Sequence, residues 1–172
     1  MSTHVKAACF VLLVGLAAPG LAQPSGVTVE TTRGSAVRLS ALWGRPAVLF
    51  YEDKDGAAQN QPLKEELAAQ GHARGLASAV NVIAVANVEG FDWFPAKSFV
   101  VSTVREAEEA SGIPVYLDFH GALKLKPWAL TGKGSTVAVV DQNGSLVFAR
   151  NGPLSREEIN HVVELLVRLV SR

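Results

Sequence analysis

The chain has 172 residues, of which 48% are hydrophobic, and it carries equal numbers of basic and acidic residues, 16 of each. Its formal net charge of zero gives no bulk electrostatic case for binding nucleic acid or an anionic membrane surface. The length indicates one domain, large enough to bury one sizeable core.

The first 22 residues have the pattern of a secretory signal peptide. Lys6 supplies a positive charge, and residues 7–18 form an apolar run that is short for a stable membrane anchor. Small residues precede a cleavage site after Ala22. We predict a signal peptide over residues 1–22 and a single periplasmic or secreted domain over residues 23–172, with an uncleaved anchor as the alternative.

The only cysteine of the chain, Cys9, lies inside this segment. A lipidated cysteine follows the apolar run of its signal, whereas Cys9 precedes most of that run, so the sequence favours cleavage over lipidation. The mature chain is then free of thiols, and without Lys6 it has 15 basic and 16 acidic residues. Such a domain depends on core packing because no disulfide can stabilise it.

The first half of the domain alternates strand and helix patterns. Residues 27–32 and 36–39 indicate an N-terminal hairpin, and the continuous apolar run at residues 47–51 is typical of a strand buried on both faces. After a polar loop, Pro62 indicates the first turn of a helix that we expect to end before Gly71.

The middle of the domain repeats the pattern. Residues 79–88 read as a second buried strand, and Pro95 opens a helix that Gly112 stops. Five of its residues form one apolar stripe: Val100, Val101, Val104, Ala107 and Ala110. A further strand is expected at residues 115–119.

The C-terminal part has the clearest local signals. An Asn-Gly turn at residues 143–144 lies between apolar runs at residues 136–140 and 145–149, which predicts a hairpin. Ser155 and Glu158 then form a capping-box pattern before a helical apolar repeat. The whole order predicts an α/β sandwich with a mixed sheet and a C-terminal helix.

Two segments of this order resemble the thioredoxin-like fold. The strand that ends at Tyr51 and the later segment starting at Pro62 are similar to the strand and proline-containing helix that flank the redox motif of thioredoxins. This resemblance puts residues 54–57 at the position of Cys-x-x-Cys, where Lys54 and Ala57 replace the two cysteines. Aligning the hairpins puts Thr136 at the position of the cis-proline, which is also absent.

A closer resemblance is to the YtfJ-type family of bacterial periplasmic proteins. It covers most of the mature chain and is best from Phe99 onward, notably at residues 135–144 and 148–158. The resemblance implies a thioredoxin-like fold and a location in the cell envelope. It implies no catalytic residue, cofactor or assigned activity.

The missing thiols exclude a class of chemistry. Thiol–disulfide exchange and thiol-dependent peroxide reduction proceed through a thiolate nucleophile, for which no other side chain substitutes. The mature chain alone is therefore neither a disulfide oxidoreductase nor a thiol peroxidase. Only an externally supplied thiol could restore such activity.

The most polar candidate site is the loop that contains Glu52, Asp53, Lys54 and Asp55. Its carboxylates could bind a hard cation, but the glycine and glutamate that a calcium-binding EF-hand loop requires are absent. The simpler interpretation is a solvated acidic loop before a helix, where carboxylates favour the positive end of the helix dipole. Thr136 could offer a hydroxyl to a ligand, although it is also well suited to begin a strand.

Aromatic residues concentrate in two loops, at residues 91–94 and at Trp128. If exposed together they would form a contact patch for a partner. We expect them to be buried instead, because large aromatic side chains are mostly buried in folded proteins.

These observations favour an exported, non-redox thioredoxin-like protein that binds an envelope protein or peptide and uses no cofactor or metal. The candidate ligand or partner surface consists of Glu52, Asp53, Lys54, Asp55 and Thr136. The alternatives are a thiol-independent or metal-assisted enzyme that uses Glu52, Asp53 and Asp55, and a carrier of a small ligand.

Overall fold

A computed structural model describes residues 26–171 of the chain. The predicted signal peptide and Cys9 lie outside the described residues. Between residues 26 and 171, no helix is both long enough and apolar enough to cross a membrane.

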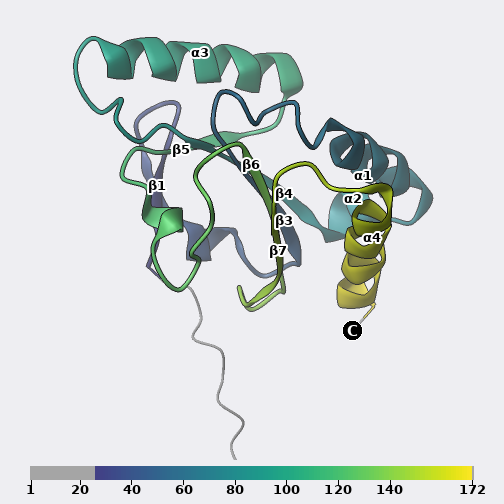
Figure 1. Ribbon diagram of the computed structural model, residues 1–172. Helices are drawn as coiled ribbons and strands as arrows, with labels where there is room; N and C mark the ends of the chain where they lie inside the picture. Colours follow the sequence, from purple (N-terminus) through teal and green to yellow (C-terminus); the bar gives the residue numbers. More distant parts are fainter. Residues whose placement is uncertain (1–25, 172) are drawn as a thin grey trace, which may run out of the picture.

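One mixed sheet of seven strands forms the centre of the domain (Figure 1). The strands are β1 (Thr28–Thr31), β2 (Ala36–Arg38), β3 (Ala47–Glu52), β4 (Asn81–Asn87), β5 (Val115–Asp118), β6 (Ser135–Val140) and β7 (Leu146–Asn151). They are arranged in the order β2-β1-β5-β4-β3-β6-β7, in which β3, β4 and β5 are parallel and the remaining pairs are antiparallel. The α/β fold and the N-terminal hairpin predicted from the sequence are confirmed.

Strand β3 is the central element of the core, and its residues 47–51 are all buried, as their unbroken apolar run predicts. Side chains alternate along a strand, so neighbouring residues face opposite layers. Leu49 and Tyr51 pack with β4 and β6 residues on one face, whereas Val48 and Phe50 pack on the other.

The two faces of the sheet are covered differently. Helices α1 (Gln61–Ala73), α2 (Leu76–Ala79) and α4 (Arg156–Val170) pack on the face of Val48 and Phe50. The opposite face is covered by the short 3-10 helices η1 (Leu39–Leu42) and η2 (Ala122–Lys124) and by the chain around them, which buries Trp128 and Leu130. The third layer is therefore built mostly of irregular chain.

One helix boundary differs from the sequence expectation, and one short helix is additional to it. Gly71 lies inside α1 instead of after its end, where an added Cβ would meet only Ala77 at ordinary contact distance. Helix α2 is not predicted by the sequence pattern, and it includes Ala79, the first residue of the strand expected at residues 79–88. Because α2 is a single turn that buries only Leu76, it leaves almost no periodic pattern in the sequence.

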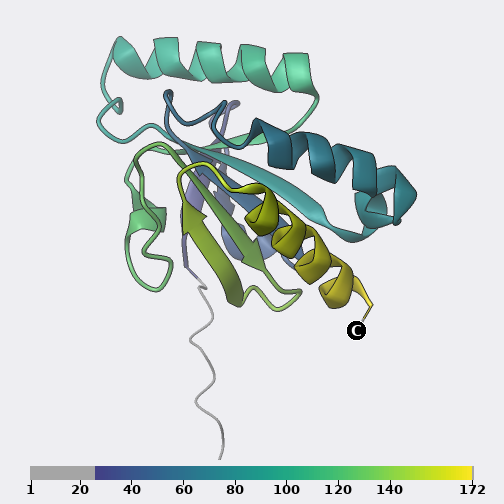
Figure 2. The same cartoon turned by 45° about the vertical axis from the view of Figure 1, so that its right-hand side comes forward.

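Helix α3 (Ala96–Ser111) lies over the ends of β4 and β5, and Figure 1 and Figure 2 show it above the sheet in both views. Val100, Val101 and Val104 pack against Leu117 and its neighbours, but none of the residues of α3 is fully buried. The apolar stripe that packs on the sheet is shorter than predicted, because Ala107 and Ala110 are exposed.

Helix α4 begins with the predicted capping box. The Ser155 hydroxyl accepts a hydrogen bond from Glu158 N at 3.2 Å, and the Glu158 carboxylate accepts one from Ser155 N at 2.8 Å. These bonds hold the pKa of Glu158 below its ordinary value, with Arg150 contributing through its charge. The capping therefore fixes where the chain turns from β7 into the last helix.

The two aromatic loops differ in how much of their side chains is exposed to solvent. Trp128 is buried, as expected, with 2% of its surface exposed. The expectation is wrong for Phe91, Trp93 and Phe94, which are 43%, 59% and 86% exposed.

Candidate functional site

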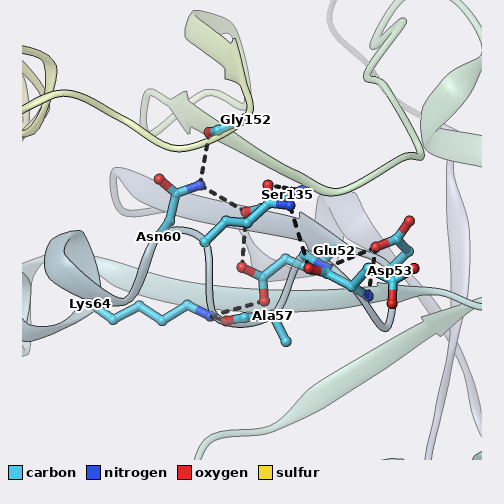
Figure 3. A network of polar contacts seen from close by, with 10 residues as sticks. Glu52, Asp53, Ala57, Asn60, Lys64, Ser135 and Gly152 are labelled. Atoms are coloured by element: carbon cyan, nitrogen blue, oxygen red, sulfur yellow. Dashed lines mark hydrogen bonds and ion pairs between the residues drawn. The ribbon is translucent and has the colours of Figure 1, made fainter.

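The candidate site lies where β3 ends and β6 begins. Residues 53–60 follow β3 and run against the segment 132–135 that leads into β6 (Figure 3). Asp53 N donates to Gly134 O at 3.0 Å, and Gly134 N donates back to the Asp53 carboxylate at 2.9 Å. One backbone bond and one bond to a side chain thus join the two segments.

Gly56 allows this close approach. A Cβ on Gly56 would lie 2.2 Å from the carbonyl carbon and oxygen of Gly134 and 2.6 Å from Ser135 N. All three are backbone atoms, which cannot swing aside as a flexible side chain does. The local sequence does not reveal this requirement, since the two segments are far apart along the chain.

Glu52 lies beneath the loop, between two donors. Ser135 Oγ donates to Glu52 Oε1 at 2.9 Å, and Lys64 Nζ donates to Glu52 Oε2 at 2.9 Å. Lys64 also donates to the carbonyl of Ala57 at 2.9 Å, which ties the first turn of α1 to the loop. The carboxylate is thus paired with a cation and with a hydroxyl in a mostly buried position.

Asn60 completes this polar network and is 1% exposed. Its amide nitrogen donates to Ser135 Oγ at 2.9 Å and to Gly152 O at 3.1 Å, while its oxygen accepts from Leu154 N at 2.9 Å. One side chain therefore connects the start of α1, the start of β6 and the chain after β7, as Figure 3 shows in part.

The Asp53 carboxylate binds backbone N–H groups of the loop and of the facing segment. Its carboxylate accepts hydrogen bonds from the backbone N–H groups of Asp55 at 3.0 Å, Gly56 at 2.9 Å and Gly134 at 2.9 Å. Lys54 and Asp55 pair with each other at 2.6 Å on the surface. This hydrogen bond raises the pKa of Lys54 above its ordinary value.

Thr136 does not line the loop. It is 2% exposed, and its hydroxyl lies 2.9 Å from the carbonyl oxygen of Thr131 and 3.0 Å from Asn151 Oδ1. The structure thus brings Glu52, Asp53, Lys54 and Asp55 together, whereas Thr136 supports the chain behind them. Sequence reasoning missed Asn60, Lys64 and Ser135, which have no local motif.

A shallow groove of about 340 Å³ opens beside this network. It is lined by Asp53, Asp55, Gln59, Lys133, Gly134, Asn151, Gly152 and Pro153. A second depression of about 530 Å³ lies near the start of β4 and includes Trp43, Arg45 and Tyr116. Because β4 begins at the opposite end of the sheet, this depression shares no residue with the groove.

The acidic loop does not form a cluster suited to a metal. Among residues 26–171, no group of three or more His, Cys, Asp or Glu side chains is placed to hold an ion. The oxygens of Asp53 are directed at backbone N–H groups, and Glu52 faces Lys64 and Ser135. The metal-assisted alternative gains no support from this geometry.

A second polar pair lies on the opposite face of β3. Tyr51 Oη donates to Asp118 Oδ2 at 3.0 Å, and both side chains are almost completely buried. Asp118 also accepts from the N–H groups of Ala122 at 2.9 Å and Leu123 at 3.1 Å, at the start of η2. Burial, with the negative charge of Asp118 second, raises the pKa of Tyr51 far above its ordinary value of 10.0.

Comparison with known families gives one match. The model of a family described as bacterial proteins of unknown function, YtfJ_HI0045, matches residues 53–169, which include the groove, the candidate loop except Glu52, and α4 except its last residue. Among curated protein sequences, none matches this chain.

Solved structures with similar folds are thioredoxin-like. The exposed lipoprotein thioredoxin Etrx1 of Streptococcus pneumoniae is 18% identical with a TM-score of 0.60, covering 83% of this chain and 98% of that one. A secreted disulfide oxidoreductase of Mycobacterium tuberculosis, homologous to DsbE, is 17% identical with a TM-score of 0.54, covering 86% and 99%. At these identities the likeness shows the fold alone.

Proposed function

The chain belongs to the bacterial family of unknown function YtfJ_HI0045, and we propose that it acts in the cell envelope as a non-redox binding protein. In this proposal the groove beside Asp53 and Lys133 receives an extended segment of a partner protein. The whole sequence contains one cysteine, so an intramolecular dithiol–disulfide couple is impossible. Export rests on the signal-peptide pattern of residues 1–22.

One observation carries the proposal: the polar side chains that flank residues 54–57 are bonded to one another. Glu52, Asn60 and Ser135 are held by the contacts described above, and Ser135 is fully buried. A catalytic nucleophile or base needs access to its substrate. Asn60 and Ser135 have no such access, and Glu52 is occupied by Lys64 and Ser135. All three instead support the segments that line an open groove.

The groove has features that suit an extended chain. Asn151 ends the edge strand β7, and Gly152 and Pro153 continue its wall. Edge strands offer unpaired backbone groups to which a partner can add a strand. The volume of about 340 Å³ accommodates a few residues, which suits a short peptide segment.

A site-specific cross-link tests this function. A photoreactive amino acid is placed at Lys133, in the groove, and as a control at Asn143, in the exposed turn between β6 and β7. We expect a discrete adduct in the host envelope from Lys133 only, and the purified partner should then bind with an affinity that Lys133→Glu weakens. No adduct, or the same adducts from both positions, would contradict the proposal.

The non-redox part has its own test. The purified protein is added to an insulin-reduction assay with dithiothreitol, beside a thioredoxin. We expect the uncatalysed rate, and a clear acceleration would overturn this part of the proposal.

A further inference from the structure

Four large aromatic side chains are exposed within nine residues. Phe91, Trp93, Phe94 and Phe99 are 43%, 59%, 86% and 74% exposed, and together they are called the aromatic patch below. The patch spans the loop before α3 and its first turn, at the upper end of the molecule in Figures 1 and 2. The other large exposed hydrophobic residues in the described chain are dispersed among separate elements. Exposed aromatic residues gathered in this way mark interaction surfaces.

The local contacts hold the patch in place with its rings outward. Lys97 N donates to Trp93 O at 2.9 Å, and Trp93 Nε1 donates to Gly90 O at 3.0 Å. The ammonium of Lys97 lies 4.2 Å from the ring centre of Phe119 and so occupies the inward position that an aromatic ring would need. The patch is therefore a feature of the folded loop, since its polar groups are already bonded when the rings face solvent.

We propose that the aromatic patch is the interface of a homodimer. At roughly 150–250 Å² for each aromatic side chain, the exposed fractions leave on the order of 500 Å² of apolar surface on the four rings. Homodimer interfaces are about 65% apolar, so this surface corresponds to about 800 Å² per partner. That is the area of a standard stable interface.

The charges beside the patch agree with a second copy as the occupant. Lys97 pairs with Asp92 at 2.7 Å and with Glu30 at 3.4 Å, and Glu89 pairs with Lys124. These two lysines and three carboxylates are all paired within one chain and sum to a charge of −1, so the patch offers little charge to a partner recognised by charge. A second copy brings the same rings, and a two-fold interface requires a surface that is complementary to itself.

The experiment is the molar mass in solution at rising concentration, measured by light scattering on the protein as its host processes it. We expect a mass twice that of one chain, reached at micromolar concentration. Phe94→Ser and Phe99→Ser should each weaken the dimer at least about tenfold. Val147→Ser, at a 43% exposed position on β7, is the matched control and should leave the dimer intact.

Two outcomes overturn the proposal. One is a wild-type protein that stays monomeric at several hundred micromolar, and the other is a dimer that survives both Phe→Ser changes. If a variant fails to fold, hydrogen exchange of the wild type decides, because residues 91–99 should be protected more strongly at high than at low concentration. The dimer is independent of the proposed function, as no groove residue belongs to the aromatic patch.

Discussion

The network beneath the groove and the aromatic patch are opposites in composition and accessibility. Around Asn60 and Ser135, polar side chains are buried and bonded to one another, whereas Phe94 and Phe99 are apolar and face solvent. Buried polar groups are costly unless they are satisfied, and exposed aromatic surface is uncommon unless it is used. The buried side chains of the first region therefore support the groove from beneath, whereas the rings of the second region are exposed to contact with another molecule.

The largest loss of stability is expected from Gly56→Ala. The new Cβ would collide with the backbone of Gly134 and force the two segments apart, at a cost of about 3 kcal/mol or more. Urea unfolding measures the loss. The control is Gly71→Ala, inside α1, which should stabilise the protein by about 0.5–1 kcal/mol because alanine favours a helix interior. Equal effects of the two changes would remove the argument for close packing at Gly56.

Asn60→Ala tests the network itself. The change leaves Leu154 N and Gly152 O without their partner, and we expect the free energy of unfolding to fall by about 2 kcal/mol. Chemical denaturation is again the measurement. If this variant were as stable as the wild type, the network would not hold the site together, and the contrast between the buried network and the aromatic patch would be lost.

Tyr51→Phe examines the opposite face of β3. The change removes one donor to the buried carboxylate of Asp118 and should cost about 1–2 kcal/mol at neutral pH. Because folding raises the pKa of Tyr51, its stabilising effect is complete below the ordinary value of 10.0 and declines as pH rises above it. Stability measured between neutral and strongly alkaline pH should therefore fall less steeply in Tyr51→Phe than in the wild type.

The smallest change in stability is expected from Phe94→Ser, measured at protein concentrations too low for self-association. The ring is 86% exposed, so its loss removes few contacts within the chain, and stability should stay within about 0.5 kcal/mol of the wild type. A larger loss would mean that the aromatic patch belongs to the folded core, and the contrast between the two regions would disappear.

Local patterns predicted the elements of the fold well. The apolar run of residues 47–51 and the Ser155–Glu158 capping box are complete within a few residues, so each could be identified without tertiary information. The boundary of α1 was wrong because Gly71 is tolerated inside a helix when packing compensates for its flexibility.

The candidate site was predictable only in part. The loop from Glu52 to Asp55 was found from its composition and its place after β3. Asn60 and Ser135 are 75 residues apart in the sequence, and neither has a motif, so their hydrogen bond becomes visible only in the folded chain. The burial expected for the aromatic residues holds for Trp128 and is wrong for residues 91–94, because average burial says nothing about Lys97, which fills the inward position over Phe119.

The end of β3 has a further consequence for binding energetics. Tyr51 and Glu52 are consecutive, point to opposite faces, and each fixes a different loop through its terminal oxygen atoms. Only the loop that Glu52 holds lies beside the groove, so a ligand there would meet a wall that is already ordered on folding, and little ordering entropy would oppose binding. Calorimetry with a bound peptide should then show a heat-capacity change set by the apolar area that the peptide covers, with no added contribution from folding of the loop.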